Sequence, residues 1–179
     1  MEPGHHLAQT LNSIDRRFSG GLFISRAAAE AAYKVLISKG YVDSDIHVVM
    51  SAEARNKFYT NDLPKPEVES DIPEPIGGGA EVGALVGIIS AVTTSLLIPG
   101  VGLVIGPLAA GLLGAGAGGI LGSLIDAFMA SGLPESHAKQ YEDGIRDGRI
   151  FIGFHPDSDA DALQIEKIWK DLGGEQVYF

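Results

Sequence analysis

The feature that most constrains this chain is a run of 44 consecutive residues, 82–125, without a charged side chain. The run is rich in glycine, alanine, leucine and isoleucine, and residues 114–122 read GAGAGGILG. It is long enough for two helices of roughly 20 residues, each about 30 Å long, which is the thickness of a bilayer's hydrocarbon core. A segment that is apolar on every side must be surrounded by apolar groups, from lipid or from protein.

The rest of the chain has a different composition. Of the 24 glycines, 15 lie within residues 77–132, whereas Phe128 is the one aromatic residue there. The chain therefore joins a charged, aromatic-containing part to an apolar, glycine-rich part. Its 179 residues suit one small domain that carries a large insertion.

The charge and the residue types exclude several classes of function. A net charge of −10, with no cluster of lysine or arginine, argues against general binding to nucleic acid. Because the chain has no cysteine, it has no disulfide and no thiolate chemistry. The first residues lack the basic and then apolar pattern of a signal peptide, so we expect a protein that is not secreted.

The part of the chain before the run predicts one β-α-β unit. Residues 21–25 and 45–50 have the apolar, β-branched character of strands. Between them, Ser25 is a predicted N-cap and Gly40 is predicted to end the helix in the left-handed conformation.

The C-terminal part repeats this plan. Strands are predicted at residues 149–154 and 175–179, and between them a helix that starts after Ser158 and ends at Gly173. Both helices present apolar residues at i, i+3 and i+4, the spacing of one buried face. These residues are Ala32, Val35 and Leu36 in the first helix and Ile165, Ile168 and Trp169 in the second.

Two such halves pack most economically as a four-stranded antiparallel sheet with two helices on one face. The predicted class is therefore α+β, a ferredoxin-like domain made of two β-α-β halves with an inserted apolar, glycine-rich helical hairpin. The predicted organisation is an N-terminal segment (1–17), the first half (18–59), an acidic Pro/Gly linker (60–79), a glycine-zipper helical hairpin (80–132), and a helix with the second half (133–179).

Within the insertion, helices are predicted at residues 80–98 and 107–131, with a turn at residues 99–102. A glycine inside a helix costs about 1 kcal/mol relative to alanine, so this many glycines require a packing role. Small residues four apart form ridges that let two helix backbones approach closely. The predicted packing and self-association residues are Gly83, Gly87, Gly111, Gly114, Ala115, Gly118, Gly119 and Gly122.

The surroundings of the hairpin stay open at the level of sequence. Its length and lack of charge favour lipid, but it lacks the Trp/Tyr belts and flanking Lys/Arg that anchor membrane spans. Hairpins from several copies could instead bury one another in a shared apolar layer. A hairpin buried within a single soluble domain is the third reading, and two small β-α-β units offer little surface to cover it.

Asp126 is the one charged residue within the second predicted helix. If the arms fold back near residue 100, its carboxylate reaches the start of the first helix and caps the N–H groups of residues 78–80. The alternative is an intramembrane acid in a proton or ion relay.

Motifs that resemble chemical sites lack the required context. Residues 114–119 match G-x-G-x-x-G but do not follow a predicted strand, so we expect no dinucleotide cofactor. Residues 157–161 resemble the start of an EF-hand, yet Ala162 and Ile168 stand where glycine and glutamate are needed, so we expect no metal. The histidines are expected to be solvated or locally hydrogen-bonded. With no recognisable nucleophile motif, we expect no enzyme.

The order of parts resembles the bacterial general-stress proteins of the heat-induced stress protein type. The resemblance covers about residues 18–179 and is most specific at residues 98–104 (IPGVGLV) and 133–148 (LPESHAKQYEDGIRDG). It implies a ferredoxin-like domain with a glycine-zipper insert, a link to stress response, and no established catalysis. The acidic linker before the hairpin is longer than the short loop expected of that family.

The sequence therefore predicts a non-enzymatic stress-associated protein of the bacterial cytoplasm or cytoplasmic membrane. Its predicted partner is itself, as a homo-oligomer or large assembly, or membrane lipid, and it has no cofactor. The alternative is a soluble ligand-binding or regulatory module, which would need a pocket of convergent polar groups on the sheet. Ion conduction has thin support, because few polar residues accompany Asp126 in the arms.

Overall fold

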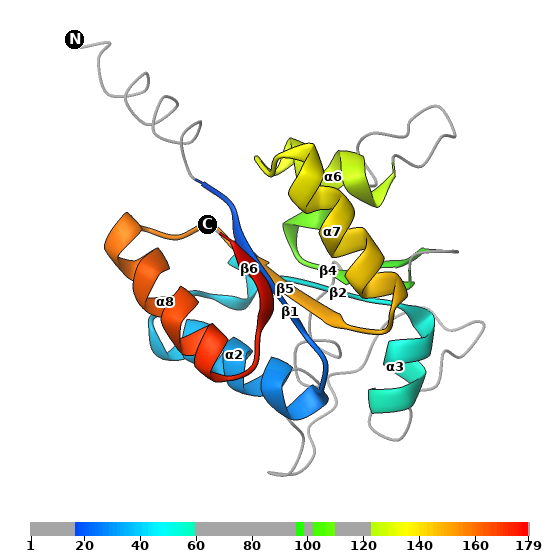
Figure 1. Ribbon diagram of the computed structural model, residues 1–179, viewed down its shortest axis with the longest axis horizontal. Coiled ribbons are helices and arrows are strands. Elements are labelled where there is room, and N and C mark those ends of the chain that lie inside the picture. Colours follow the sequence, from blue (N-terminus) through cyan, green and yellow to red (C-terminus); the bar gives the residue numbers. More distant parts are fainter. Residues whose placement is uncertain (1–16, 60–95, 99–101, 110–122, 179) are drawn as a thin grey trace, which may run out of the picture.

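The computed structural model describes residues 17–59, 96–98, 102–109 and 123–178. Nearly all of the N-terminal segment, the linker and most of the predicted glycine-zipper hairpin lie outside these ranges. Figure 1 labels the described elements, which follow the chain in this order: β1 (Ser19–Phe23), α2 (Arg26–Ser38), the 3-10 helix η1 (Asp43–Asp45), β2 (His47–Met50), α3 (Ala52–Tyr59), β3 (Leu96–Ile98), β4 (Gly102–Ile105), α6 (Leu124–Ala130), α7 (Glu135–Arg146), β5 (Ile150–Phe154), α8 (Asp159–Asp171) and β6 (Glu175–Tyr178).

The described strands form one six-stranded sheet in the order β6-β1-β5-β2-β4-β3. Every neighbouring pair is antiparallel. The α+β class and the antiparallel pairing expected from the sequence are therefore confirmed, but the sheet has six strands rather than four, and helices pack on both of its faces. The sheet places β5 between β1 and β2, so the two halves of the chain interleave.

One face of the sheet is covered by α2 and α8 (Figure 1). Alternate strand residues such as Ile150 and Ile152 point to this side, as the period of two in a strand requires. Trp169 of α8 is 1% exposed, and its indole N–H donates to the Ala32 carbonyl of α2 at 3.1 Å. The predicted apolar helix faces are thus the buried ones, with Val35 and Ile168 at their partly exposed margins.

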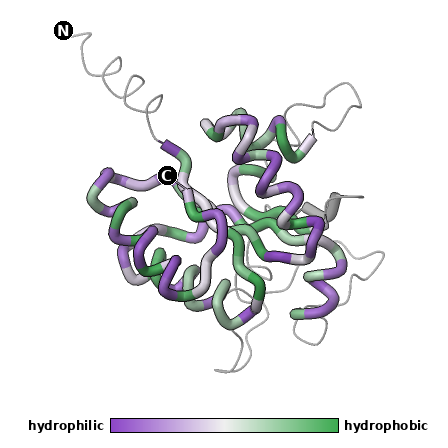
Figure 2. Tube along the Cα trace, in the orientation of Figure 1, coloured by the Kyte–Doolittle hydropathy of each residue, from purple (hydrophilic) through white to green (hydrophobic). Residues whose placement is uncertain are grey.

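The opposite face is covered by α6 and α7 (Figure 1). Phe151 of β5 points to this side and lies against Phe128 of α6 and Tyr141 of α7, with ring centroids 4.8 and 4.7 Å apart. Hydrophobic residues follow the central strands that lie between the two helical layers (Figure 2). Because both faces are covered, the central strands are buried along their whole length.

The predicted helix ends in the two halves are confirmed. The Ser25 and Ser158 hydroxyls accept the backbone N–H groups of Ala28 and Asp161, which is the bonding of an N-cap. Gly40 and Gly173 have φ of +97° and +81°, the left-handed conformation expected after a helix. The first strand begins two residues earlier than predicted, at Ser19.

The first predicted helix of the hairpin is wrong at residues 96–98, and the stretch between the two predicted helices is a strand. Residues 96–98 and 102–105 are the strands β3 and β4, paired around the predicted turn. Short apolar runs such as LLI and LVI beside a Pro-Gly turn satisfy the strand pattern as well as the helix pattern. Pairing of β4 with β2, and of β3 with β4, decides for the strand.

The predicted second helix is also not continuous. Residues 107–109 are helical, but Ser123 is extended (φ −64°, ψ 155°) and is the N-cap of α6, which starts at Leu124. The sequence S-x-x-D at residues 123–126 closes a capping box, which marks a helix start rather than a helix interior. Helix α3 was not anticipated.

In the described ranges, no helix combines the length and the apolar character that a membrane crossing requires.

Candidate functional site

The residues predicted to pack helices together all lie outside the described part of the chain. These are Gly83, Gly87, Gly111, Gly114, Ala115, Gly118, Gly119 and Gly122. The structure does describe how the uncharged run joins the domain on both sides of residues 110–122. These two attachments hold the ends of residues 110–122, which contain most of the predicted self-association residues.

The first attachment is β4, which pairs with β2 along its length. Val48, Val49 and Met50 of β2 lie opposite Ile105, Val104 and Leu103. All four residues of β4 are buried. This part of the uncharged run is therefore part of the sheet, and its apolar character is explained by burial on both faces.

Glycines at the two ends of β4 permit its close approach to β2. Gly102 and Gly106 have φ of +110° and +89°. A Cβ atom would lie 2.3 Å from the Met50 carbonyl oxygen at Gly102, and 2.3 Å from the Ile46 carbonyl oxygen at Gly106. No side chain fits there without moving the backbone. Two glycines of the run thus serve strand pairing rather than helix packing.

His47 holds the residues that follow β4. Leu108 donates its backbone N–H to Nδ1 of His47 at 3.1 Å, and the two residues are 2% and 1% exposed. Burial, and then the nearby His155, lowers the pKa of His47 from 6.5 to about 3. His47 is therefore neutral at physiological pH and acts as an acceptor for a residue 61 positions along the chain. No pattern in the sequence indicates this contact.

The second attachment is α6. Leu124 and Phe128 are buried in the same apolar cluster as Leu108 and Ala109. Both ends of residues 110–122 are thus fixed on the face of the sheet that α6 and α7 cover.

Asp126 lies in the first turn of α6 and is exposed. Its carboxylate accepts the backbone N–H of Ser123 at 3.1 Å, and its own N–H donates to the Ser123 hydroxyl. The structure thus places this carboxylate as a cap on its own helix. The partners predicted for it, residues 78–80, lie outside the described residues.

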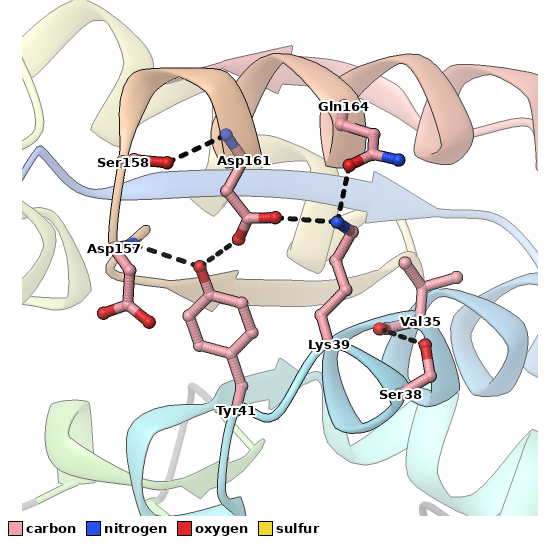
Figure 3. Close-up of polar contacts among 8 residues, drawn as sticks. All are labelled: Val35, Ser38, Lys39, Tyr41, Asp157, Ser158, Asp161 and Gln164. Carbon is pink, nitrogen blue, oxygen red and sulfur yellow. Dashed lines mark hydrogen bonds and ion pairs between the residues drawn. The ribbon is translucent and has the colours of Figure 1, made fainter.

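A polar cluster joins the end of α2 to the start of α8 (Figure 3). Nζ of Lys39 lies 2.7 Å from Oδ1 of Asp161 and 2.7 Å from Oε1 of Gln164. The Tyr41 hydroxyl donates to Oδ2 of Asp161 at 2.5 Å and accepts the N–H of Asp157 at 3.1 Å. These bonds engage the carboxylate of Asp161 and the backbone N–H of Asp157.

The charge states in this cluster follow from its bonds. Burial alone would raise the pKa of Asp161, but the hydrogen bonds from Lys39 and Tyr41 outweigh it and hold the pKa below its usual 3.8. Burial, followed by the bond to Asp161, raises the pKa of Tyr41. The cluster is therefore a carboxylate held ionised by one cation and one neutral phenol. We interpret it as a clamp between the two halves of the fold.

Replacing Asp161 with asparagine is expected to lower the free energy of unfolding by about 1–2 kcal/mol at pH 7, because Lys39 loses its ionic partner. Since the folded pKa is the lower one, the unfolded chain binds the proton first as pH falls. The difference in the free energy of unfolding between wild type and Asp161→Asn therefore has its full size above pH 3.8, and it shrinks as the pH falls below that value. Urea unfolding at pH 7 and pH 3 measures it.

Asp159→Asn is the matched control, because Asp159 is exposed and its ion pair with the exposed Arg17 is long, at 4.0 Å. A change within about 0.5 kcal/mol is expected there. Equal effects of the two substitutions would contradict the clamp.

Other candidate centres in the described residues are weaker. No group of three or more His, Asp or Glu side chains in these ranges is placed to hold a metal ion. A shallow depression lies among α8, β1, β5 and β6, and it leaves essentially no room for a water molecule. Its lining is mainly apolar, with Ser19 and Glu166 among the few polar residues. That lining lacks the several convergent polar groups that the ligand-binding alternative requires.

Comparison of the chain with protein-family models, with curated proteins and with solved structures finds no match.

Proposed function

We propose that this chain is a non-enzymatic, stress-associated protein that self-associates through its apolar segment, residues 80–131. The observation that carries the proposal is the anchoring of that segment on both sides of residues 110–122, by Leu108 and Ala109 before them and by Leu124 after them. The six predicted packing residues of the second arm all fall between these anchors. A tethered, uncharged stretch with small residues four apart is suited to packing against another copy of itself.

We also propose a ferredoxin-like core, a link to stress response and the surroundings of the apolar segment. The order β6-β1-β5-β2, with α2 and α8 on one face, supports two interleaved β-α-β halves of the ferredoxin-like kind. We propose that β3 and β4 extend this core at one edge. The link to bacterial stress response rests on the sequence resemblance over residues 18–179. The surroundings of the assembled segments are other copies or the cytoplasmic membrane.

Gly118→Leu tests self-association. Leucine at the centre of the ridge 114, 118, 122 would keep two helix backbones apart, so the particle mass should fall toward the 18.8 kDa of one chain. Light scattering on the soluble fraction and on the detergent-extracted membrane fraction measures the mass. Circular dichroism should show that the α+β domain remains folded.

Ala160→Leu is the control, because Ala160 is exposed on α8, lies outside residues 80–131 and receives the same leucine side chain. It should leave the particle mass unchanged. A wild-type chain that is monomeric in both fractions, or a Gly118→Leu variant with wild-type mass, would refute the proposal.

A further inference from the structure

His47 and Leu108 form a buried contact whose chemistry depends on one proton. The imidazole accepts the Leu108 N–H at Nδ1, so the proton of the neutral ring is on Nε2. Nε2 is buried and has no hydrogen-bond partner among the described residues. The ring therefore has one essential role on this face of the sheet, which is to accept the bond from Leu108.

The surroundings of His47 oppose a positive charge. The Phe18 and His47 rings form a T-shaped pair with centroids 5.0 Å apart, and the His155 ring follows at 5.7 Å. Opposite His47 on β5 is Gly153, which brings no charge. Of the described titratable groups, His155 is the one whose charge acts on His47, and it is repulsive when protonated. No carboxylate is recorded as acting on the ring from β4, α6 or α7 in the described ranges.

Protonation of His47 and the bond to Leu108 exclude each other. A protonated imidazole carries N–H groups at both nitrogens and has no acceptor left. It would place a donor against the Leu108 N–H and a cation in a buried, apolar site. The charged ring is accommodated only if residues 106–109 move away from β2.

We infer that His47 and residues 106–109 form an acid-responsive latch, in which protonation of the imidazole releases the start of the glycine-rich segment from the sheet. The latch itself is independent of what that segment does. Only its consequence, that acid alters self-association, rests on the proposed function.

The size of the response follows from linkage. In the closed form the pKa of His47 is about 3, and in the open form the ring has its ordinary pKa of 6.5. Because the closed form has the lower value, the closed state is fully favoured above pH 6.5 and loses stability as pH falls. The open population should rise by about tenfold per pH unit below about pH 6, and by about 100-fold between pH 7.5 and pH 4.5.

Hydrogen exchange at the Leu108 amide tests the latch in the full-length chain. The exchange rate is divided by the intrinsic rate at each pH, so that only the open population is compared. Between pH 7.5 and 4.5 the protection of Leu108 should fall by about 100-fold in wild type. In His47→Asn it should stay constant, because the amide oxygen accepts the same bond and does not titrate. His137→Asn, on α7, should behave as wild type.

Two results would overturn the latch: constant protection in wild type, or the same pH dependence in His47→Asn. If that variant does not fold, imidazole nitrogen shifts of wild-type protein decide instead. The latch requires a neutral ring with the proton on Nε2 down to pH 4.5, and titration near pH 6.5 in the folded chain would contradict it. Neither readout needs assembly, so a monomeric chain would defeat the proposed function and leave the latch standing.

Discussion

Phe151→Ala is expected to lower the free energy of unfolding by about 3–5 kcal/mol. Phe151 is fully buried and lies at the centre of the face that α6 and α7 cover. Its ring is within 4.8 Å of the Phe128 ring and 4.7 Å of the Tyr141 ring, centroid to centroid. Removing it leaves a cavity between the sheet and both helices. The loss is a large part of the about 5–15 kcal/mol that stabilises a typical domain.

The backbone near Phe151 offers little means of closing that cavity. Gly20 and Gly153 lie opposite each other on β1 and β5, and a Cβ at either would meet the Phe151 ring at 2.6 or 2.7 Å. The ring thus covers the backbone at both glycines, beside Phe18 over Gly153 and the Tyr141 hydroxyl over Gly20. Phe151→Leu keeps most of the volume and should cost about 1–2 kcal/mol. Urea unfolding compares the variants, and a loss below about 1 kcal/mol for Phe151→Ala would contradict the packing role.

The two β-α-β units were predictable because their signals are local. Ser25 and Ser158 each bond to an N–H three residues away, so the cap and its partner are visible in the same short window. Gly40 and Gly173 act through their own φ angles. Helix faces also follow from spacing alone, as Leu36 and Trp169 show by being buried.

The insertion was mispredicted because its structure depends on distant partners. Residues 103–105 are a strand because β2 pairs with them, and β2 is more than 50 positions away. At residues 96–98 the composition led to a predicted helix, since a short apolar run such as LLI fits an apolar helix as well as a strand. The start of α6 was the exception. Ser123 and Asp126 carry a local capping signal that the long apolar pattern obscured.

The anchors of the candidate self-association segment had no sequence signal at all. Nothing in the spacing of His47 and Leu108 indicates that they meet, since the contact arises from the sheet order. No role was predicted for Gly106, yet its place is fixed by the Ile46 carbonyl oxygen, which a Cβ atom would meet at 2.3 Å. A glycine-rich sequence therefore shows where backbones come close but not which backbones they are.

Gly106→Ala is expected to lower the free energy of unfolding by about 3 kcal/mol or more. The left-handed φ of +89° costs an L-residue about 1–2 kcal/mol. In addition, the new Cβ would lie 2.3 Å from the Ile46 carbonyl oxygen, a backbone atom that moves only if β2 and β4 separate. That separation also displaces Leu108 from His47, so the protection of the Leu108 amide should be lost at pH 7.

Gly148→Ala separates the two contributions. Gly148 has a nearly identical φ of +88°, but a Cβ there meets no described atom within 4 Å. Its cost should be the conformational one alone, about 1–2 kcal/mol, with Leu108 protection unchanged. Urea unfolding measures both losses in the free energy of unfolding. The amount by which the loss for Gly106→Ala exceeds that for Gly148→Ala is the contribution of the close approach between β4 and β2. Equal costs at the two positions would mean that the sheet yields there, and that Gly106 does not hold the glycine-rich segment in place.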